Sequence, residues 1–180
     1  MALSKETHHV TSNEHVPLSG NTIRTADIND LDNIVSCAIA FEKTLQEIDP
    51  KRIVHSKEEL REAYSKRILN SDPTHEYHIV VAEAEGRILG YAIGKAPRIK
   101  PNNFYVLFQG VYVTERARGK GIADLLSQDV LDFAKRLGAK SVQGEAYRGS
   151  LGDAYFGQKK GWEEIKEKSN LRTKRLALAL

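Results

Sequence analysis

The hydrophobic positions of this chain change their spacing several times between residue 21 and the C-terminus. Residues 21–26 form a short predicted strand. In the helix predicted next, apolar residues recur every three or four positions, at Leu31, Ile34, Val35, Ala38 and Leu45. Pro50 separates this helix from a second one, which begins at the capping box Ser56–Glu59 and ends near Asn70. The only cysteine, Cys37, lies in the first helix and is expected to be a small core residue.

The middle of the chain has the pattern of paired strands. Residues 78–84 and 87–93 flank Glu85-Gly86, which predicts a tight hairpin. A basic loop with two prolines is predicted over residues 95–101. The next strand covers residues 104–113, and Gly110 within it predicts a bulge or a close backbone approach.

The most regular helical stripe runs from Ile122 to Leu137, and Gly138 predicts its end. After it the pattern predicts a strand over 141–147, a short helix over 150–160, and two short strands near 162–167 and 171–179. The predicted order is β-α-α-β-β-β-α-β-α-β-β, which is typical of a mixed α/β domain with three layers.

Composition narrows the class of protein. A chain of 180 residues with 41% hydrophobic residues fits one globular domain, which we expect over residues 21–180. One cysteine excludes an internal disulfide framework, and no apolar run approaches the ~18 residues of a membrane span. Residues 1–20 are polar and predict a flexible arm; its adjacent His8 and His9 lack the rest of a metal site. We therefore expect a cytoplasmic protein without a metal.

The charge of the chain does not favour nucleic acid as a partner. Lysine and arginine number 27 against 24 aspartates and glutamates, so the net charge is only +3. The basic positions near 95–100, 116–120 and 159–175 are interrupted by Glu163, Glu164 and Glu167. A phosphate-binding surface would not carry so many acidic residues, and no nucleic-acid partner is predicted.

The segment richest in chemistry is Arg116-Ala117-Arg118-Gly119-Lys120-Gly121, between a predicted strand and the helix at 122–137. A helix start exposes unpaired N–H groups at the positive end of its dipole. Glycines at 119 and 121 let a phosphate approach these amides without a Cβ in the way. Arg116, Arg118 and Lys120 add positive charge, so a pyrophosphate is the natural ligand. The structural alternative, a solvated basic turn, remains open from these residues alone.

The two common nucleotide-binding loops do not fit this segment. It lacks the Gly-Lys-Ser/Thr of a P-loop. A dinucleotide-binding loop would need a third glycine where Asp124 stands.

Residues 111–126 resemble the acyl-CoA-binding signature of the GNAT N-acetyltransferase superfamily, Gln/Arg-x-x-Gly-x-Gly/Ala at the mouth of a helix. The run from Ala154 to Trp162, which ends Lys-Lys-Gly-Trp, is similar to the second conserved segment of that family. The resemblance extends over about residues 21–180. It implies a three-layer GNAT-like fold with a mixed, mostly antiparallel central sheet.

The resemblance also implies an activity. Acetyl-CoA would lie where the strands at 107–113 and 141–147 splay apart, and an amine would attack its thioester directly, without an acyl-enzyme. The implied cofactor-binding residues are Val111, Tyr112, Val113, Arg116, Arg118, Gly119, Lys120, Gly121, Ile122, Ala123 and Ser150. In this family the backbone of the central strand polarises the thioester carbonyl as an oxyanion hole does.

The chain departs from the family at the two catalytic positions. Gln109 stands where many members carry a glutamate base, and Gly157 stands where they carry a tyrosine that protonates the leaving thiolate. Glu145 is the candidate base in its place and Tyr147 the candidate acid. Tyr155 is two residues from the family position and is expected to point to a different side of its helix.

Several alternatives remain open at this point. The departures leave a CoA-binding or regulatory module without turnover as a second hypothesis. The amine acceptor is not identified; a small amine, an antibiotic, a polyamine and a protein N-terminus or lysine all fit. The first two helices, the 95–101 loop and the last hairpin are expected to shape its site, with His55, His75 and His78 as candidate neighbours. The apolar strand at 176–180 offers an edge for a homodimer.

Overall fold

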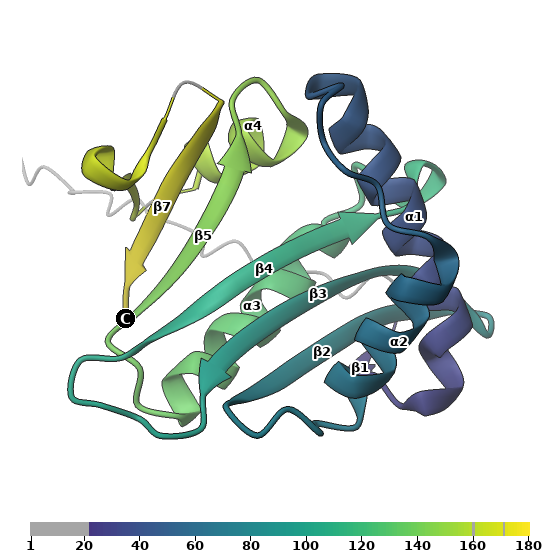
Figure 1. Cartoon of the computed structure of the whole chain (residues 1–180), viewed down its shortest axis with the longest axis horizontal. Coiled ribbons are helices and arrows are strands. Elements are labelled where there is room, and N and C mark those ends of the chain that lie inside the picture. Colours follow the sequence, from purple (N-terminus) through teal and green to yellow (C-terminus); the bar gives the residue numbers. More distant parts are fainter. Residues whose placement is uncertain (1–21, 160, 171) are drawn as a thin grey trace, which may run out of the picture.

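The computed structural model describes residues 22–159, 161–170 and 172–180. The predicted N-terminal arm, residues 1–20, lies outside the described residues, as does Asn21. A seven-stranded sheet forms the centre of the described structure, with helices on both faces (Figure 1). In chain order the strands and α-helices are β1 (Thr22–Thr25), α1 (Leu31–Ile48), α2 (Lys57–Ile68), β2 (His75–Ala84), β3 (Arg87–Pro97), β4 (Tyr105–Val113), α3 (Ile122–Arg136), β5 (Ser141–Tyr147), α4 (Leu151–Gly157), β6 (Trp162–Glu164) and β7 (Thr173–Ala179).

The predicted order of elements and the mixed, mostly antiparallel sheet are confirmed. The strands lie side by side in the order β1-β2-β3-β4-β5-β7-β6, and only β4 and β5 are parallel. The β4–β5 pairing runs from Tyr105 opposite Ser141 to Phe108 opposite Gly144 and then stops. Beyond that point β4 stays paired with β3 and β5 stays paired with β7. The two central strands therefore diverge, which opens the sheet in its middle (Figure 1).

Alternating side chains along the strands fill two separate cores. On one face Val80, Ala82 and Ala92 pack with buried residues of α3, among them Leu126 and Val130. On the other face Ile79, Val81, Tyr91 and Ile93 pack against α1 and α2. Because successive residues of a strand point to opposite faces, a nearly continuous apolar run in β2 serves both layers.

Local signals fixed the starts and ends of several elements. The Ser56 hydroxyl accepts a hydrogen bond from the Glu59 amide at 3.2 Å, and the Glu59 carboxylate accepts one from the Ser56 amide at 2.7 Å, so the capping box is confirmed. Gly138 has a φ of +75° and ends α3 as predicted. Cys37 is buried on α1, and burial raises the pKa of its thiol, which fits a core residue.

Two expectations about strands β3 and β7 were wrong. The loop predicted over 95–101 starts later, because β3 pairs with β4 as far as Lys95 and with β2 as far as Pro97. The strand at 173–179 is not an edge, since Leu176 and Leu178 pair with β5 on one side and β6 on the other. This part of β7 therefore has no free edge for pairing with a second copy.

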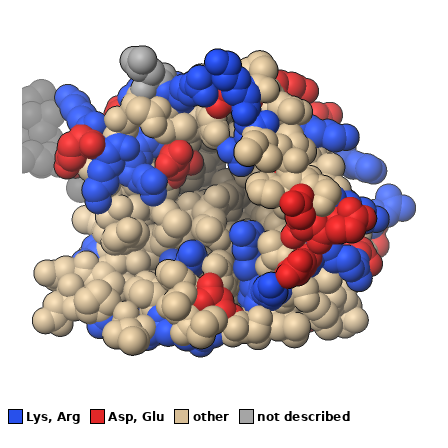
Figure 2. Space-filling view, viewed as in Figure 1, with Lys and Arg blue, Asp and Glu red and all other residues tan. Residues whose placement is uncertain are grey.

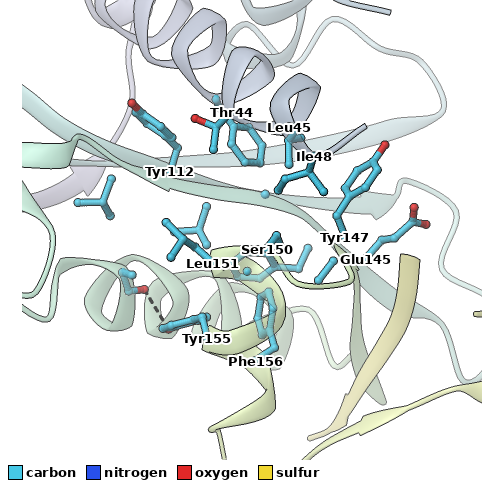
Figure 3. Close-up of a pocket in the computed structure, with 18 of the residues that line it drawn as sticks. Thr44, Leu45, Ile48, Tyr112, Glu145, Tyr147, Ser150, Leu151, Tyr155 and Phe156 are labelled. Atoms are coloured by element: carbon cyan, nitrogen blue, oxygen red, sulfur yellow. Dashed lines mark hydrogen bonds between the residues drawn. The ribbon is translucent and has the colours of Figure 1, made fainter. Parts of the chain in front are cut away.

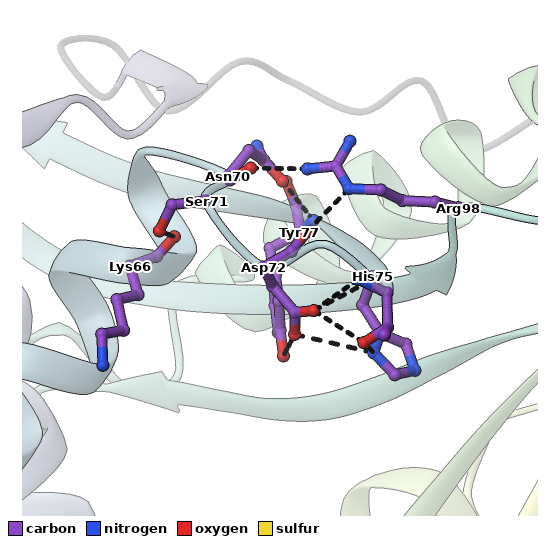
Figure 4. Close-up of polar contacts among 8 residues, drawn as sticks. Lys66, Asn70, Ser71, Asp72, His75, Tyr77 and Arg98 are labelled. Carbon is purple, nitrogen blue, oxygen red and sulfur yellow. Dashed lines mark hydrogen bonds and ion pairs between the residues drawn. The ribbon is translucent and has the colours of Figure 1, made fainter.

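A polar cluster connects the end of α2 with β2 and β3 (Figure 4). The Asp72 carboxylate accepts hydrogen bonds from the Thr74 hydroxyl and amide, both at 2.7 Å, and from the His75 amide at 3.1 Å. These bonds, led by the one from the Thr74 hydroxyl, hold the pKa of Asp72 well below its ordinary value. The Arg98 guanidinium donates to the carbonyl oxygens of Asn70 and Asp72. His75 is therefore a member of a structural cluster.

Candidate active site

A cavity of about 410 Å³ lies where β4 and β5 diverge. Figure 2 shows this hollow in the centre of one face, with mostly uncharged side chains inside and charged ones around it. Its walls come from α1, β4, β5, α4 and the start of α3. The volume is within the range of ordinary small-molecule sites.

The edge of β4 that faces this cavity carries backbone groups without a partner strand. Residues 110–113 pair with β3, and no described strand pairs with their other edge. The register shifts between Ile93 and Gly94, which leaves Gln109 as the extra residue of a bulge. The predicted bulge is therefore present, next to Gly110, whereas a Cβ at Gly110 would make only an ordinary contact with the Phe41 ring at 3.4 Å and no close backbone approach. The strand can thus offer N–H and C=O groups to an extended ligand.

Apolar side chains make up most of the remaining wall (Figure 3). From α1 they are Phe41, Leu45 and Ile48, and from the opposite side Phe108, Leu151 and Phe156. Ile48 and Leu151 are 40% and 65% exposed, so the mouth of the cavity presents apolar surface to solvent. Such a wall suits the aliphatic part of a ligand, while polar groups are confined to a few positions.

The start of α3 has the geometry of an anion site. Gly119 and Gly121 both have φ of +73°, a conformation that glycine adopts without a steric penalty. No hydrogen bond within the described part of the chain uses the amides of residues 119–123, whereas the Asp124 amide already donates to the Gly121 carbonyl at 3.0 Å. Nothing lies within 4 Å of a Cβ placed at either glycine. A free row of N–H groups at a helix start attracts anions.

The acidic residue in the first turn of α3 is neutralised. Asp124 accepts a hydrogen bond from the Tyr155 hydroxyl at 2.8 Å and forms an ion pair with Lys159 at 2.6 Å. The nearby Arg118 donates from Nε to the Val113 carbonyl at 3.1 Å and lines the cavity at this end. The field at the start of α3 therefore favours a negatively charged ligand.

Tyr155 lines the cavity, with its hydroxyl directed toward α3 (Figure 3). Besides Asp124, the hydroxyl lies 3.1 Å from Ser127 Oγ. Burial raises the pKa of Tyr155 well above its ordinary value. The hydroxyl proton is thus held by α3 and is not directed into the cavity.

The predicted catalytic candidates lie at the other end of the cavity, on the diverging part of β5 (Figure 3). The Glu145 carboxylate forms an ion pair with Arg175 of β7 at 2.8 Å, and its side chain is 43% exposed. The Tyr147 hydroxyl accepts a hydrogen bond from Arg52 Nη1 at 2.7 Å. Glu145 and Tyr147 are two residues apart on one strand, so they project from the same face.

Ser150 and Gly157 begin and end the short helix α4. The Ser150 hydroxyl caps the helix by accepting from the Asp153 amide at 3.0 Å, and its own proton is not used by any described residue. Ser150 lines the cavity and can therefore donate one hydrogen bond into it. Gly157 does not line the cavity, and nothing lies within 4 Å of a Cβ placed on it.

The structure brings together most of the residues that sequence analysis selected. Those lining the cavity are Gln109, Val111, Tyr112, Val113, Arg118, Ala123, Glu145, Tyr147 and Ser150. Those beside it, in the turn before α3 or in its first turn, are Arg116, Gly119, Lys120, Gly121 and Ile122. The side chain of Ile122 is buried in the core, so only its backbone can face a ligand.

Sequence analysis expected the first helix to shape the acceptor site but did not identify which residues of α1, and of the connection after it, do so. Phe41, Thr44, Ile48 and Arg52 line the cavity, and the helical stripe alone did not separate cavity positions from core positions. The three candidate histidines lie elsewhere. His55 contacts Glu42 at 2.8 Å, and the ring of His78 stacks on Phe133 at 4.8 Å and contacts Asp129.

The described part of the chain carries neither a candidate metal site nor a helix that could cross a membrane. It contains no cluster of three or more histidine, cysteine, aspartate or glutamate side chains placed to hold a metal ion. None of its helices combines the length and apolar character needed to cross a membrane.

Comparison with known proteins agrees with this geometry. Solved structures of similar fold include an N-acetyltransferase from Staphylococcus aureus Mu50 (21% identity, TM-score 0.67, 89% of this chain and 99% of that one covered). The PaiA N-acetyltransferase of Thermoplasma acidophilum in complex with coenzyme A has 16% identity, a TM-score of 0.66 and the same coverage. YncA of Salmonella typhimurium with its cofactor acetyl-CoA has 20% identity and a TM-score of 0.65, with 90% of this chain and 95% of that one covered.

At these identities the solved structures establish a shared fold. No curated protein sequence matches the chain. The family model of the acetyltransferase (GNAT) family matches residues 41–148, which is more than half of the chain and includes the divergence of β4 and β5, the glycine turn and α3. The chain therefore belongs to the GNAT family of acetyltransferases.

Proposed function

We propose that this protein is an N-acetyltransferase that moves an acetyl group from acetyl-CoA to a primary amine by direct attack in a ternary complex. The proposal rests on one observation: two backbone surfaces that could bind a ligand border the same cavity. The unused amides of residues 119–123 lie at one end of the cavity, and the unpaired edge of β4 runs along it. Acetyl-CoA offers a pyrophosphate and an extended amide-containing arm, which match these two features.

The residues present fit acetyl-CoA as the donor substrate. The amides of residues 119–123 would bind the pyrophosphate, with Arg116, Arg118 and Lys120 supplying positive charge. The backbone of Val111 and Val113 would bind the pantetheine amides and polarise the thioester carbonyl. Ser150 would add one hydrogen bond. Two of the similar solved structures contain coenzyme A or acetyl-CoA, which supports this choice of donor.

The reaction needs a neutral amine and a protonated leaving group. The amine nitrogen forms a bond to the thioester carbon, and the carbon–sulfur bond breaks to release the thiolate of CoA. Glu145 would first take one proton from the ammonium through water, which leaves a neutral amine to attack. Tyr147 would donate its proton to the leaving thiolate and recover one from the nitrogen of the new amide. The amide of Gln109 has no basic group for the first role.

Tyr147 fits the acid role better than Tyr155. Its hydroxyl accepts from Arg52, and no described residue accepts the Tyr147 proton. The proton of Tyr155 is committed to α3. Tyr147 of β5, which lines the cavity, would thus replace the tyrosine that is missing at position 157.

A CoA-binding module without turnover is the second candidate. Gln109 and Gly157 favour it, because both stand where family members carry catalytic groups. The ion pair of Glu145 with Arg175 also favours it, since that pairing occupies the carboxylate.

We further propose that one domain over residues 21–180 performs the function, in the cytoplasm.

One experiment separates these candidates. Binding of acetyl-CoA is measured by thermal shift with ADP as the control, and release of CoA thiol is followed over a panel of primary amines. Binding with amine-dependent thiol release supports the acetyltransferase. Binding without release for any amine supports the module, and no binding of acetyl-CoA contradicts both.

A further inference from the structure

Arg52, in the connection between α1 and α2, lines the cavity without a carboxylate partner among the described residues. Its Nη1 donates to the Tyr147 hydroxyl at 2.7 Å, and its Cζ lies 5.6 Å from the centre of the Tyr147 ring. Its Nε is buried and has no hydrogen-bond acceptor. A buried donor without an acceptor is unfavourable, and such groups in native structures call for an explanation such as a ligand.

The other arginines at this end of the molecule are already paired. Each has a carboxylate partner: Arg172 with Asp49 at 3.1 Å, Arg175 with Glu145 at 2.8 Å, and Arg148 with Glu164 at 2.6 Å. Arg52 differs from them in having only a phenol and an aromatic face. Its positive charge is therefore available at the edge of the cavity.

Arg52 and Glu145, which carry opposite charges, both line this cavity. Arg52 donates to the Tyr147 hydroxyl, and Glu145, which is also paired with Arg175, is two residues away from Tyr147 on β5. Leu45 and Ile48 of α1 provide an apolar wall at the same end (Figure 3). A ligand that fits here carries a positive and a negative group on a small, partly apolar frame.

We propose that the amine acceptor also carries a carboxylate, and that Arg52 binds this carboxylate while the amino group lies toward Glu145. The class of acceptor is thus a free amino acid. A planar guanidinium binds carboxylates with paired N–H donors, which a lysine at this position would not reproduce. This inference rests on the proposed acetyltransferase function and names the substrate class of the same site. Polyamines and lysine side chains lack the anionic group that Arg52 would bind.

The test uses pairs of amines that differ only in the carboxylate. Each of the proteinogenic amino acids is compared with its decarboxylated amine and its carboxamide, and kcat/KM is measured from thiol release with saturating acetyl-CoA. For the preferred side chain we expect the amino acid to exceed both analogues by about 10- to 100-fold, mainly through KM. Arg52→Gln should remove this preference, and Arg52→Lys should restore part of it.

The design separates the two contacts of Arg52. In Arg52→Gln, any change in kcat/KM for the decarboxylated amine comes from loss of the Arg52–Tyr147 hydrogen bond, because this amine has no carboxylate. The ratio of kcat/KM between the amino acid and its amine therefore isolates the contact of Arg52 with the carboxylate. Arg172→Gln is the matched control, because Arg172 is bound to Asp49 and should leave the ratio unchanged.

The possible outcomes test this inference separately from the proposed function. Turnover of decarboxylated amines equal to or faster than that of amino acids overturns the inference and leaves the acetyltransferase intact. An unchanged ratio in Arg52→Gln also overturns it. If other amines react but no amino acid does, the inference is again wrong, whereas no reaction with any amine, or failure to bind acetyl-CoA, contradicts the proposed function itself.

Discussion

Gly119 offers a sharp test of the anion site, because its folding role can be separated from its binding role. It has φ of +73°, and nothing lies within 4 Å of a Cβ built on it. Gly138, at the opposite end of α3, has φ of +75° and is equally open. A side chain in the left-handed region costs about 1–2 kcal/mol, so Gly119→Glu and Gly138→Glu should each lower Tm by about 2–8 °C.

The two variants should differ in their affinity for acetyl-CoA. A glutamate at position 119 places a carboxylate beside the unused amides of residues 119–123. At ~6 Å and an effective dielectric constant of ~20, one carboxylate and one phosphate charge repel by about 3 kcal/mol, which is about 100-fold in Kd. A glutamate at position 138 lies at the far end of a 15-residue helix and should leave Kd unchanged.

The measurement is a thermal shift series with acetyl-CoA, followed by calorimetric titration at low ionic strength. Ligand at ~100 times Kd should stabilise the wild type and Gly138→Glu by about 2.7 kcal/mol, or roughly 5–10 °C. Gly119→Glu should show almost no shift at the same concentration. Equal affinity of the two variants for acetyl-CoA would refute the placement of the pyrophosphate at the start of α3.

Three further predictions concern catalysis and stability. Tyr147→Phe should lower kcat at least about tenfold with acetyl-CoA affinity unchanged, whereas Tyr155→Phe should act mainly on stability; the reverse pattern in steady-state kinetics would exchange their roles. Glu145→Gln should lower kcat at pH 7 by about 100-fold, with a smaller deficit at high pH where the amine is already neutral, and a pH-independent deficit would remove Glu145 from the base role. Asp30 is 6% exposed and bound by Arg24 at 2.7 and 2.8 Å, which lowers its pKa. Because a lowered pKa stabilises the fold only while the group is ionised, Asp30→Asn should reduce the free energy of unfolding by about 2 kcal/mol at pH 7, and the difference should shrink as pH falls below about 4. Chemical denaturation across this pH range measures it, and a constant difference would contradict the linkage.

Much of the fold could be predicted because its signals are local. The stripe from Ile122 to Leu137 and the capping box at Ser56 each fix an element within a few residues. The glycine turn before α3 is local as well, since positive φ at 119 and 121 follows from residue type and sequence neighbours. Residues 116–123 could therefore be selected as a candidate anion-binding segment without any knowledge of the tertiary structure.

The ends of strands were less predictable, because they depend on the neighbouring strands with which each strand pairs. β3 continues through Lys95 to Pro97 because β2 pairs with it throughout, although lysine, alanine and proline there resemble a loop. β7 is enclosed because β6 returns beside it, and nothing in the apolar run at 176–180 indicated a second neighbour. Pairing between distant segments overrides local preference in sheets.

The sequence by itself determined the order of elements and the glycine turn before α3, and its resemblance to the family placed Gln109 and Gly157 where many members carry a base and an acid. Only the tertiary structure decided which side chains line the cavity between β4 and β5. Arg52 meets Tyr147 across 95 residues of chain, and Glu145 meets Arg175 across 30. The cavity itself exists because β4 keeps β3 as its neighbour while β5 keeps β7. Such contacts arise from how strands separated in sequence share a sheet, which no local pattern of residues encodes.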